Sequence, residues 1–155
     1  MMKLTIVIPA LNEEEAIGSI IQRCLDARVN ITRESPVGEV EIIVVSDGST
    51  DRTAEIASGY DGVRVIVFET NRGYGAAIKK GFEEGSGEIV GFLDADGTCD
   101  PKFFSVLCNA LADERADVAL GSRMGADSRM PKIRRFGNRI YALILSALSN
   151  KVVAD

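Results

Sequence analysis

The sequence predicts an α/β fold in which a mostly parallel sheet carries helices on both faces. Runs rich in Val and Ile alternate along the chain with helical patterns, an order typical of a parallel sheet with covering helices. These runs are continuously apolar, as in strands that are buried on both faces. The chain of 155 residues is 46% hydrophobic and 26% charged, which suits one soluble domain with a sizeable core.

The first two expected strands lie at residues 3–9 (KLTIVIP) and 40–46 (VEIIVVS), where β-branched residues dominate. A helical pattern covers residues 13–28 between them. The polar stretch at 30–39 (NITRESPVGE) is expected to be a loop. The chain should therefore cross from the first strand to the second through a helix and a long connection.

The turn SDGSTDRT follows the second strand. Gly48 permits a tight turn, and Ser49 or Thr50 is expected to accept hydrogen bonds from the first N–H groups of a helix at 51–59. Asp47 ends the strand, where its carboxylate could accept a hydrogen bond from a ligand N–H, such as N3–H of uracil or N1–H of guanine.

The rest of the chain continues the alternation. Gly73 and Gly75 of NRGYG could let the backbone approach a base or a diphosphate closely, although a glycine-rich helix start explains them as well. The remaining strands are expected at 63–69 (VRVIVFE), 88–94 (EIVGFLD) and 117–122 (DVALGS), and the remaining helices at 74–84, 101–112 and 133–149.

Composition limits the chemistry that the chain can perform. Histidine is absent, which removes the commonest general base and transition-metal ligand, so catalysis has to rely on carboxylates. Cys24, Cys99 and Cys108 are odd in number and lack the spacing of zinc or redox sites, so reduced thiols are expected. The apolar N-terminal stretch is short and stopped by Pro9, unlike a secretory signal or a membrane span, so a cytoplasmic protein is expected.

Polar residues follow every expected strand, at the edge where open parallel sheets bind ligands. In the segment DADGTCDP, Asp94 and Asp96 lie one residue apart. Two carboxylates this close repel each other unless a cation lies between them, and Mg²⁺ or Mn²⁺ binds one or two carboxylates together with phosphate oxygens. A strand end in water could also carry two acids without any metal.

Four ordered motifs, IVIPALNEEEAIG, IIVVSDGSTDRT, NRGYGAAIKKGF and GFLDADGTCDP, are followed by LGSRM and MPKIRRFGNRIYALIL. Together they resemble the family-2 inverting glycosyltransferases of GT-A fold, and within that family the branch of dolichyl-phosphate mannose and glucose synthases. The resemblance covers essentially the whole chain. It implies a nucleotide-sugar donor, a divalent cation (Mg²⁺ or Mn²⁺) at the Asp-x-Asp motif, and inversion at the anomeric carbon.

The resemblance also implies site residues. Asp94 and Asp96 would face the ribose and the metal-bound diphosphate, and Arg123 of GSR would contact a phosphate; these three form the expected catalytic set. Thr98 stands where some members have a Gln metal ligand, and Ser46 stands where the family often has an acid. The metal is therefore expected at Asp94, Asp96 and Thr98. The expected donor-binding set is Pro9, Ala10, Leu11, Glu13, Asp47, Gly73, Gly75, Asp94 and Ala95.

Two other functions stay open. FLDADGT also matches the loop of haloacid-dehalogenase-like phosphatases, where Asp94 would be the nucleophile and Asp96 the general acid, but the chain lacks convincing downstream partners for that reaction. The chain could instead be a non-catalytic nucleotide-binding fragment. Resembling sequences continue with an acceptor-side motif that begins with Asp, which Asp155 could start, so the chain is expected to be incomplete at its C-terminal end.

The expected reaction is transfer of a sugar to a polyprenyl or dolichyl phosphate. Such an acceptor is anionic at neutral pH and needs little proton chemistry, in agreement with a chain that lacks histidine. The sequence does not choose between UDP and GDP donors, or among glucose, mannose and N-acetylglucosamine.

Charge divides the chain unevenly. Residues 1–121 carry 11 Lys/Arg and 21 Asp/Glu, whereas residues 122–155 carry 7 and 2. We therefore expect a nucleotide-sugar-binding core at 1–122 and a basic acceptor and membrane side at 123–155, within one domain overall. No nucleic-acid partner is expected.

The basic residues precede or enter the expected helix at 133–149. A cationic end on an apolar helix suits an anionic membrane surface, so residues 129–148 are expected to lie in its plane with Arg134, Arg135 and Arg139 at phosphate headgroups. The alternative is a core helix that covers the sheet. The membrane interpretation predicts a peripheral protein at the cytoplasmic face of a membrane.

Overall fold

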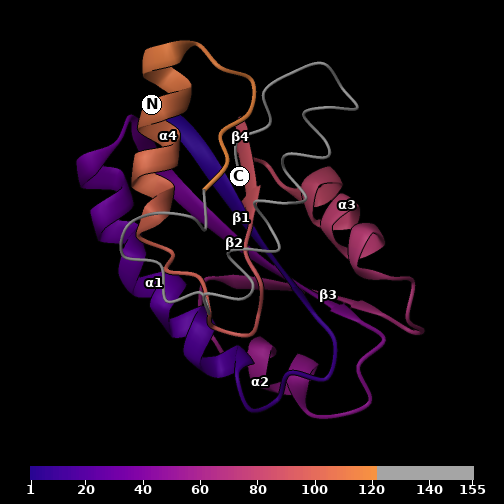
Figure 1. Cartoon of the computed structure of the whole chain (residues 1–155). Helices are drawn as coiled ribbons and strands as arrows, with labels where there is room; N and C mark the ends of the chain where they lie inside the picture. Colours follow the sequence, from indigo (N-terminus) through magenta and orange to yellow (C-terminus); the bar gives the residue numbers. More distant parts are fainter. Residues whose placement is uncertain (122–155) are drawn as a thin grey trace, which may run out of the picture. The chain divides into compact units, whose positions relative to one another are not determined.

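The computed structural model describes residues 1–121 of the chain, and predictions that fall on residues 122–155 lie outside this described part. It confirms the α/β fold with a parallel sheet (Figure 1). The strand order is β3-β2-β1-β4, and all three pairings are parallel. The strands are β1 (Met2–Ala10), β2 (Val37–Asp47), β3 (Val63–Phe68) and β4 (Ile89–Phe92).

Helices cover both faces of the sheet, as predicted. One apolar cluster joins β1 and β2 to α1, α2 and α4, and a second joins the opposite face of these strands to α3. Figure 1 shows α1 and α4 on one side of the sheet and α3 on the other. The helices are α1 (Ile17–Glu34), α2 (Thr53–Ser58), α3 (Tyr74–Glu84) and α4 (Phe103–Glu114).

The continuous apolar run of β1 reflects its place between β2 and β4. Leu4, Ile6 and Ile8 are fully buried in the cluster under α1, whereas Val7 is fully buried in the cluster under α3. Successive side chains of a strand point to opposite faces, so both parities have to be apolar when both faces are covered.

Helix α1 is longer than the sequence predicted, and the expected loop at 30–39 was wrong. The helix continues to Glu34, and β2 already begins at Val37. The physical reason is that Ile31, which lies inside the expected loop, extends the buried stripe of α1 and is itself fully buried. Only two residues remain as the connection.

Helix α3 has the predicted bounds and lies very close to the sheet. A Cβ atom at Gly81 would come within 2.3 Å of Cγ1 of Val7, so only glycine allows this approach. The close packing places the first residue of the helix, Tyr74, beside the carboxyl ends of the strands.

The predicted fifth strand was wrong for residues 117–121, the part of it that the structure describes. Within the described chain no strand pairs with this segment, and the side chains of Val118 and Leu120 are 71% and 85% exposed. An apolar sequence becomes a strand only when a neighbouring strand accepts and donates its backbone hydrogen bonds.

Residues Met1–Ala119 form one compact unit, which contains all the helices and strands described above. The expected boundary after residue 122 stays a prediction. Among residues 1–121, no helix is both long and apolar enough to cross a bilayer.

Candidate functional site

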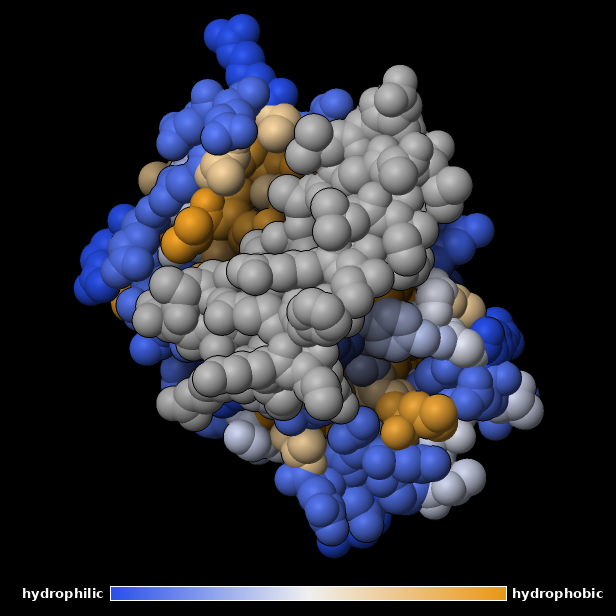
Figure 2. Space-filling view, viewed as in Figure 1, coloured by the Kyte–Doolittle hydropathy of each residue, from blue (hydrophilic) through white to orange (hydrophobic). Residues whose placement is uncertain are grey.

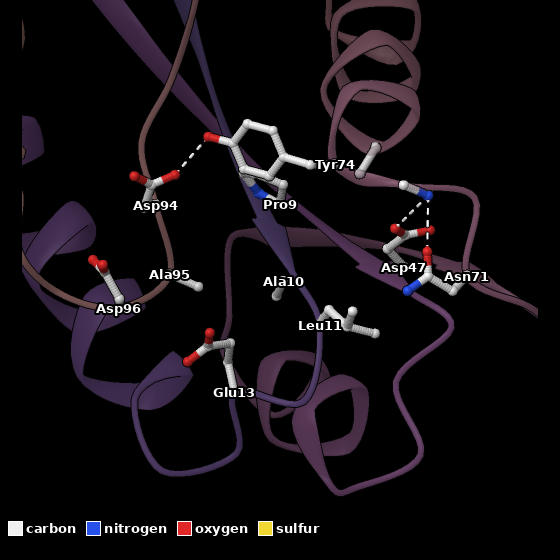
Figure 3. A pocket seen from close by; sticks show the side chains of 12 residues that line it. Pro9, Ala10, Leu11, Glu13, Asp47, Asn71, Tyr74, Asp94, Ala95 and Asp96 are labelled. Atoms are coloured by element: carbon white, nitrogen blue, oxygen red, sulfur yellow. Dashed lines mark hydrogen bonds between the residues drawn. The ribbon is translucent and has the colours of Figure 1, made fainter.

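A cavity of about 310 Å³ opens at the carboxyl ends of β1, β2 and β4 and the first turn of α3 (Figure 3). The chain runs from β1 to β2 and β3 on one side and returns to β4 on the other, so the cavity lies at the point where the strand order reverses. Open α/β sheets bind ligands at this point. The cavity is lined by Pro9, Ala10, Leu11, Glu13, Asp47, Asn71, Gly73, Tyr74, Ala77, Asp94, Ala95 and Asp96.

The structure brings together nearly all of the expected donor-site residues that it describes. Gly75 and Thr98 do not line the cavity, and Arg123 and the three membrane-side arginines lie outside the described residues. The functional roles assigned to these residues stay predictions. The residues that sequence reasoning placed here, and that line the cavity, are Pro9, Ala10, Leu11, Glu13, Asp47, Gly73, Asp94, Ala95 and Asp96.

Asp47, at the end of β2, is 3% exposed and holds the loop that follows β3. Its Oδ1 accepts a hydrogen bond from the backbone N–H of Arg72 at 2.7 Å, and its Oδ2 accepts one from that of Gly73 at 2.9 Å. The Oδ1 of Asn71 also accepts from Gly73, at 2.9 Å. The carboxylate therefore organises this side of the cavity, and a ligand N–H would share its oxygens with two backbone donors.

Tyr74 connects α3 to the acidic pair. Its hydroxyl donates a hydrogen bond to Oδ1 of Asp94 at 2.5 Å. Its ring meets the ring of Phe92, the last residue of β4, edge to face with centroids 6.3 Å apart. Ring packing and the hydrogen bond together orient Asp94. The sequence had predicted a strand that ends at Asp94, but β4 ends at Phe92, two residues earlier.

Asp96 is held by the residue that was expected to be a metal ligand. The backbone N–H and the hydroxyl of Thr98 both donate to Oδ1 of Asp96, at 2.9 and 2.8 Å. This local turn is typical of Asp side chains that accept from a residue two positions later. In this structure Thr98 therefore supports Asp96 from outside the cavity, and its ligand role stays a prediction.

The expected helix cap at Ser49 or Thr50 was wrong. Asp51 instead accepts from the N–H of Thr53, the first residue of α2. Ser49 accepts from the N–H of Asn12, whose Oδ1 accepts from the N–H of Thr50 at 2.8 Å. These hydroxyl and amide groups join the loop after β1 to the loop after β2.

Four carboxylates line the cavity, and no Lys or Arg is among the described lining residues. Figure 3 shows Glu13, Asp94 and Asp96 on one side of the cavity and Asp47 on the other. A site of this charge repels an anionic ligand unless a cation enters with it.

A divalent cation fits the donors that are present. No group of three or more His, Cys, Asp or Glu side chains within residues 1–121 is arranged to hold a metal. Mg²⁺ and Mn²⁺ at nucleotide sites commonly take one or two carboxylates and complete their coordination with phosphate oxygens and water. Asp94 and Asp96 supply a donor set of this kind, each oriented by a neighbouring hydrogen-bond donor.

Sequence reasoning missed three lining residues, Asn71, Tyr74 and Ala77. All three lie in or next to the motif NRGYGAA, whose two glycines had been selected. A helix that begins at Tyr74 places Ala77 one turn later on the same face, which the helical spacing could have indicated. The contact of Tyr74 with Asp94 had no local signal.

Comparison with known proteins agrees with this geometry. The family model for glycosyl transferase family 2 matches residues 5–152. The dolichyl-phosphate beta-glucosyltransferase of Drosophila melanogaster is 34% identical over 146 residues, which are 87% of this chain and 45% of that protein. The chain thus spans less than half the length of this relative.

Solved structures share the fold. S. aureus TarS 1-349 matches 84% of this chain and 38% of its own, with a TM-score of 0.60 and 26% identity. Glucosyl-3-phosphoglycerate synthase from Mycobacterium tuberculosis, solved with Mn²⁺, UDP and glucosyl-3-phosphoglycerate, matches 71% of this chain and 39% of its own, with a TM-score of 0.54 and 32% identity. With its motifs, its strand order and these matches, the chain belongs to glycosyl transferase family 2 and has the GT-A fold.

Proposed function

We propose that this chain binds the donor in a metal-dependent, inverting glycosyltransferase that moves a sugar from UDP- or GDP-sugar to a polyprenyl phosphate. The observation that carries the proposal is the acidic cavity at the strand ends, which Asp94 and Asp96 line together with residues of the loops after β1 and β3. The related Mycobacterium tuberculosis synthase, solved with Mn²⁺ and UDP, supports both the nucleotide and the cation. The matches to glycosyltransferases give no support to the phosphatase alternative.

We assign the nucleoside and the diphosphate of the donor to two different sides of the cavity. Pro9, Ala10 and Leu11 offer an apolar wall to the nucleoside, and Asp47 lies at its end as an acceptor for a base N–H. Asp94 and Asp96 would hold a divalent cation against the diphosphate. When bound, that cation neutralises the charge that develops on the nucleoside diphosphate as the sugar leaves.

A phosphate acceptor fits the residues of this chain. It is already anionic at neutral pH, so attack on the sugar needs no histidine or other dedicated base. The name of the Drosophila relative supports a dolichyl phosphate. The Mycobacterium relative carries glucosyl-3-phosphoglycerate, which makes a small phosphorylated acid the alternative acceptor.

We assign the acceptor side to the basic segment at 129–148, including Arg134, Arg135 and Arg139, and a phosphate contact to Arg123. These residues would hold the chain at the cytoplasmic face of a membrane, where a lipid phosphate is available. Their excess positive charge supports this assignment, since residues 122–155 carry 7 Lys/Arg against 2 Asp/Glu.

Calorimetric titration with UDP and with GDP, each with Mn²⁺ and with chelator, tests the donor site. We expect one nucleotide to bind at least about tenfold more tightly with Mn²⁺, and Asp96→Asn to remove this gain while it keeps the acceptor for Thr98. Asp100→Asn is the matched control, because Asp100 lies in the same segment, accepts from the N–H of Lys102, and does not line the cavity.

If neither chelator nor Asp96→Asn changes the affinity for the nucleotide, the metal assignment is contradicted. Radiolabelled transfer to dolichyl phosphate and to 3-phosphoglycerate, compared in the same assay, separates the two acceptors. Product from 3-phosphoglycerate alone would replace the lipid acceptor by the small phosphorylated acid.

A further inference from the structure

Arg23, on α1, does not line the cavity, yet its guanidinium holds the segment that follows the acidic pair. Nη1 donates to the backbone carbonyl of Gly97 at 2.7 Å, and Nη2 donates to that of Cys99 at 2.8 Å. One planar group therefore binds two carbonyls two residues apart. This fixes the orientation of the loop as well as its position, which a single donor could not do.

These two carbonyls flank Thr98, the residue that donates twice to Asp96. Gly97 adopts a left-handed backbone conformation, with φ of +73°, so the chain turns sharply directly after Asp96. A short chain of contacts thus runs from Arg23 through the loop backbone to Thr98 and on to Oδ1 of Asp96.

The helix that carries Arg23 is a firm support. Ile20, Ile21 and Cys24, its neighbours on α1, are all fully buried against the sheet. A loop tied to such a helix moves away from it only if the hydrogen bonds from the Arg23 guanidinium break. The exposed Asp96 would otherwise depend on its own local turn alone.

We propose that Arg23 is a positioning residue of the donor site, which fixes the loop at 97–99 and through it the metal-binding geometry of Asp96. This inference rests on the proposed function, in which Asp96 meets a divalent cation. Residues that hydrogen-bond to metal ligands commonly change metal affinity by about 10-fold to 100-fold when they are replaced, and Arg23 holds the loop that carries such a residue, Thr98. The effect should therefore appear in Mn²⁺-dependent nucleotide binding and not in binding with chelator.

Two substitutions test this role. Arg23→Met removes both donors but keeps an apolar stem, and Arg23→Lys keeps the charge but loses the planar fork. We expect both variants to weaken Mn²⁺-dependent nucleotide binding by about tenfold or more, with affinity in chelator unchanged.

Arg28 provides the matched control. It lies on the same helix and likewise donates to a loop carbonyl, that of Gly62, at 2.7 Å. Gly62 also has a positive φ, of +76°, but precedes β3 and does not line the donor cavity. Arg28→Met and Arg28→Lys should leave nucleotide binding at the wild-type level.

Cys99 provides a second readout that needs no ligand. It is partly buried against the core, so release of its carbonyl should expose its thiol and speed alkylation. Cys24 and Cys108 are fully buried, and burial raises the pKa of both thiols, that of Cys24 to about 12. Their thiols stay protonated near neutral pH and react slowly with an alkylating reagent. Rapid alkylation of all three cysteines would therefore indicate unfolding.

The expected result is faster alkylation of Cys99 alone and weaker Mn²⁺-dependent binding in both Arg23 variants. If Arg23→Met unfolds, Arg23→Lys decides. If the wild-type protein shows Mn²⁺-dependent nucleotide binding and the Arg23 variants bind as tightly as the Arg28 variants, the role of Arg23 is overturned. The proposed function then stays intact. A wild-type protein without Mn²⁺-dependent nucleotide binding would overturn the proposed function, and with it this role of Arg23.

Discussion

The two acidic residues of the cavity are oriented by different kinds of contact. Asp94 accepts from the hydroxyl of Tyr74, which comes from another helix, whereas Asp96 accepts from Thr98 in its own turn. Asp94 therefore depends on tertiary packing, and Asp96 depends on the conformation of its loop.

Tyr74→Phe should weaken Mn²⁺-dependent nucleotide binding by roughly tenfold. The substitution removes a hydrogen bond to a charged group, a contact of about 1.5 kcal/mol, but keeps the ring against Phe92. Calorimetry with UDP and GDP measures the effect. Tyr60→Phe, outside the cavity lining, is the control, and equal affinities for the two variants would exclude a role for the Tyr74 hydroxyl.

Connections between elements, more than the elements themselves, shape the cavity. The turn after β2 packs directly on the loop after β3: a Cβ atom at Gly48 would lie 2.3 Å from the backbone nitrogen of Asn71. Gly48 also has a φ of +71°. This position therefore requires glycine for space and for conformation.

Gly48→Ala should lower the free energy of unfolding by about 2–3 kcal/mol, because left-handed strain adds to the steric overlap. Gly75→Ala is the matched control, since a Cβ atom there meets nothing within 4 Å and alanine favours the helix. Urea unfolding of both variants measures the difference. Equal midpoints would mean that the two loops can separate at little cost.

Glu41, on β2, connects β1 to the segment that precedes β4. Its Oε2 accepts from the hydroxyl of Thr5 on β1 and from the N–H of Ser86 before β4. Burial alone would raise its pKa, but the backbone and side-chain hydrogen bonds from Ser86 and Thr5 outweigh it and hold the pKa of Glu41 below its ordinary value. Ionised Glu41 therefore stabilises the fold.

Glu41→Gln should lower the free energy of unfolding at pH 7 by about 1–2 kcal/mol. Since the folded pKa is lowered, the wild-type advantage is present above the unfolded pKa, about 4.3, and is lost as the pH falls through the folded value. Urea titrations from pH 3 to 7 measure this. Glu39, on the same strand, is 67% exposed, so Glu39→Gln should change the free energy of unfolding by less than about 0.5 kcal/mol. If the destabilisation by Glu41→Gln does not depend on pH, the ionic explanation is contradicted.

At the scale of the whole molecule, charge separates the described core from the rest of the chain. Residues 1–121 have ten more acidic than basic side chains, whereas residues 122–155 have five more basic than acidic ones. Figure 2 shows a described surface that is mostly hydrophilic, with a few apolar areas. The exposed apolar side chains include Val67, Phe103, Val106, Val118 and Leu120.

Arg134→Glu combined with Arg135→Glu should weaken binding to anionic vesicles by more than about tenfold, because each basic residue at such a surface contributes about 1 kcal/mol. Binding of the wild type should also fall as salt rises. Vesicle cosedimentation measures both effects. Lys79→Glu with Lys102→Glu makes the same charge change on the acidic core. Equal binding of the two double variants would contradict the membrane role and favour the alternative, in which the helix expected at 133–149 covers the sheet.

Local sequence determined the features that depend on neighbouring residues. Apolar runs placed the four strands, turn residues placed the polar loops at their ends, and α3 has the bounds that its periodicity predicted. The parallel order predicted that polar residues after the strands share one edge, and the resemblance to family-2 glycosyltransferases implied that the acidic pair and the residues around Pro9 bind one donor; both line the same cavity.

Only the tertiary structure decided which contacts hold these residues. The bonds from Arg23 to the loop at 97–99 and from Tyr74 to Asp94 join segments far apart in sequence, and no local pattern encodes them. For the same reason the segment at 117–121 could not be judged from its apolar residues. A strand exists only where another strand completes its hydrogen bonds, and among the described residues none pairs with it.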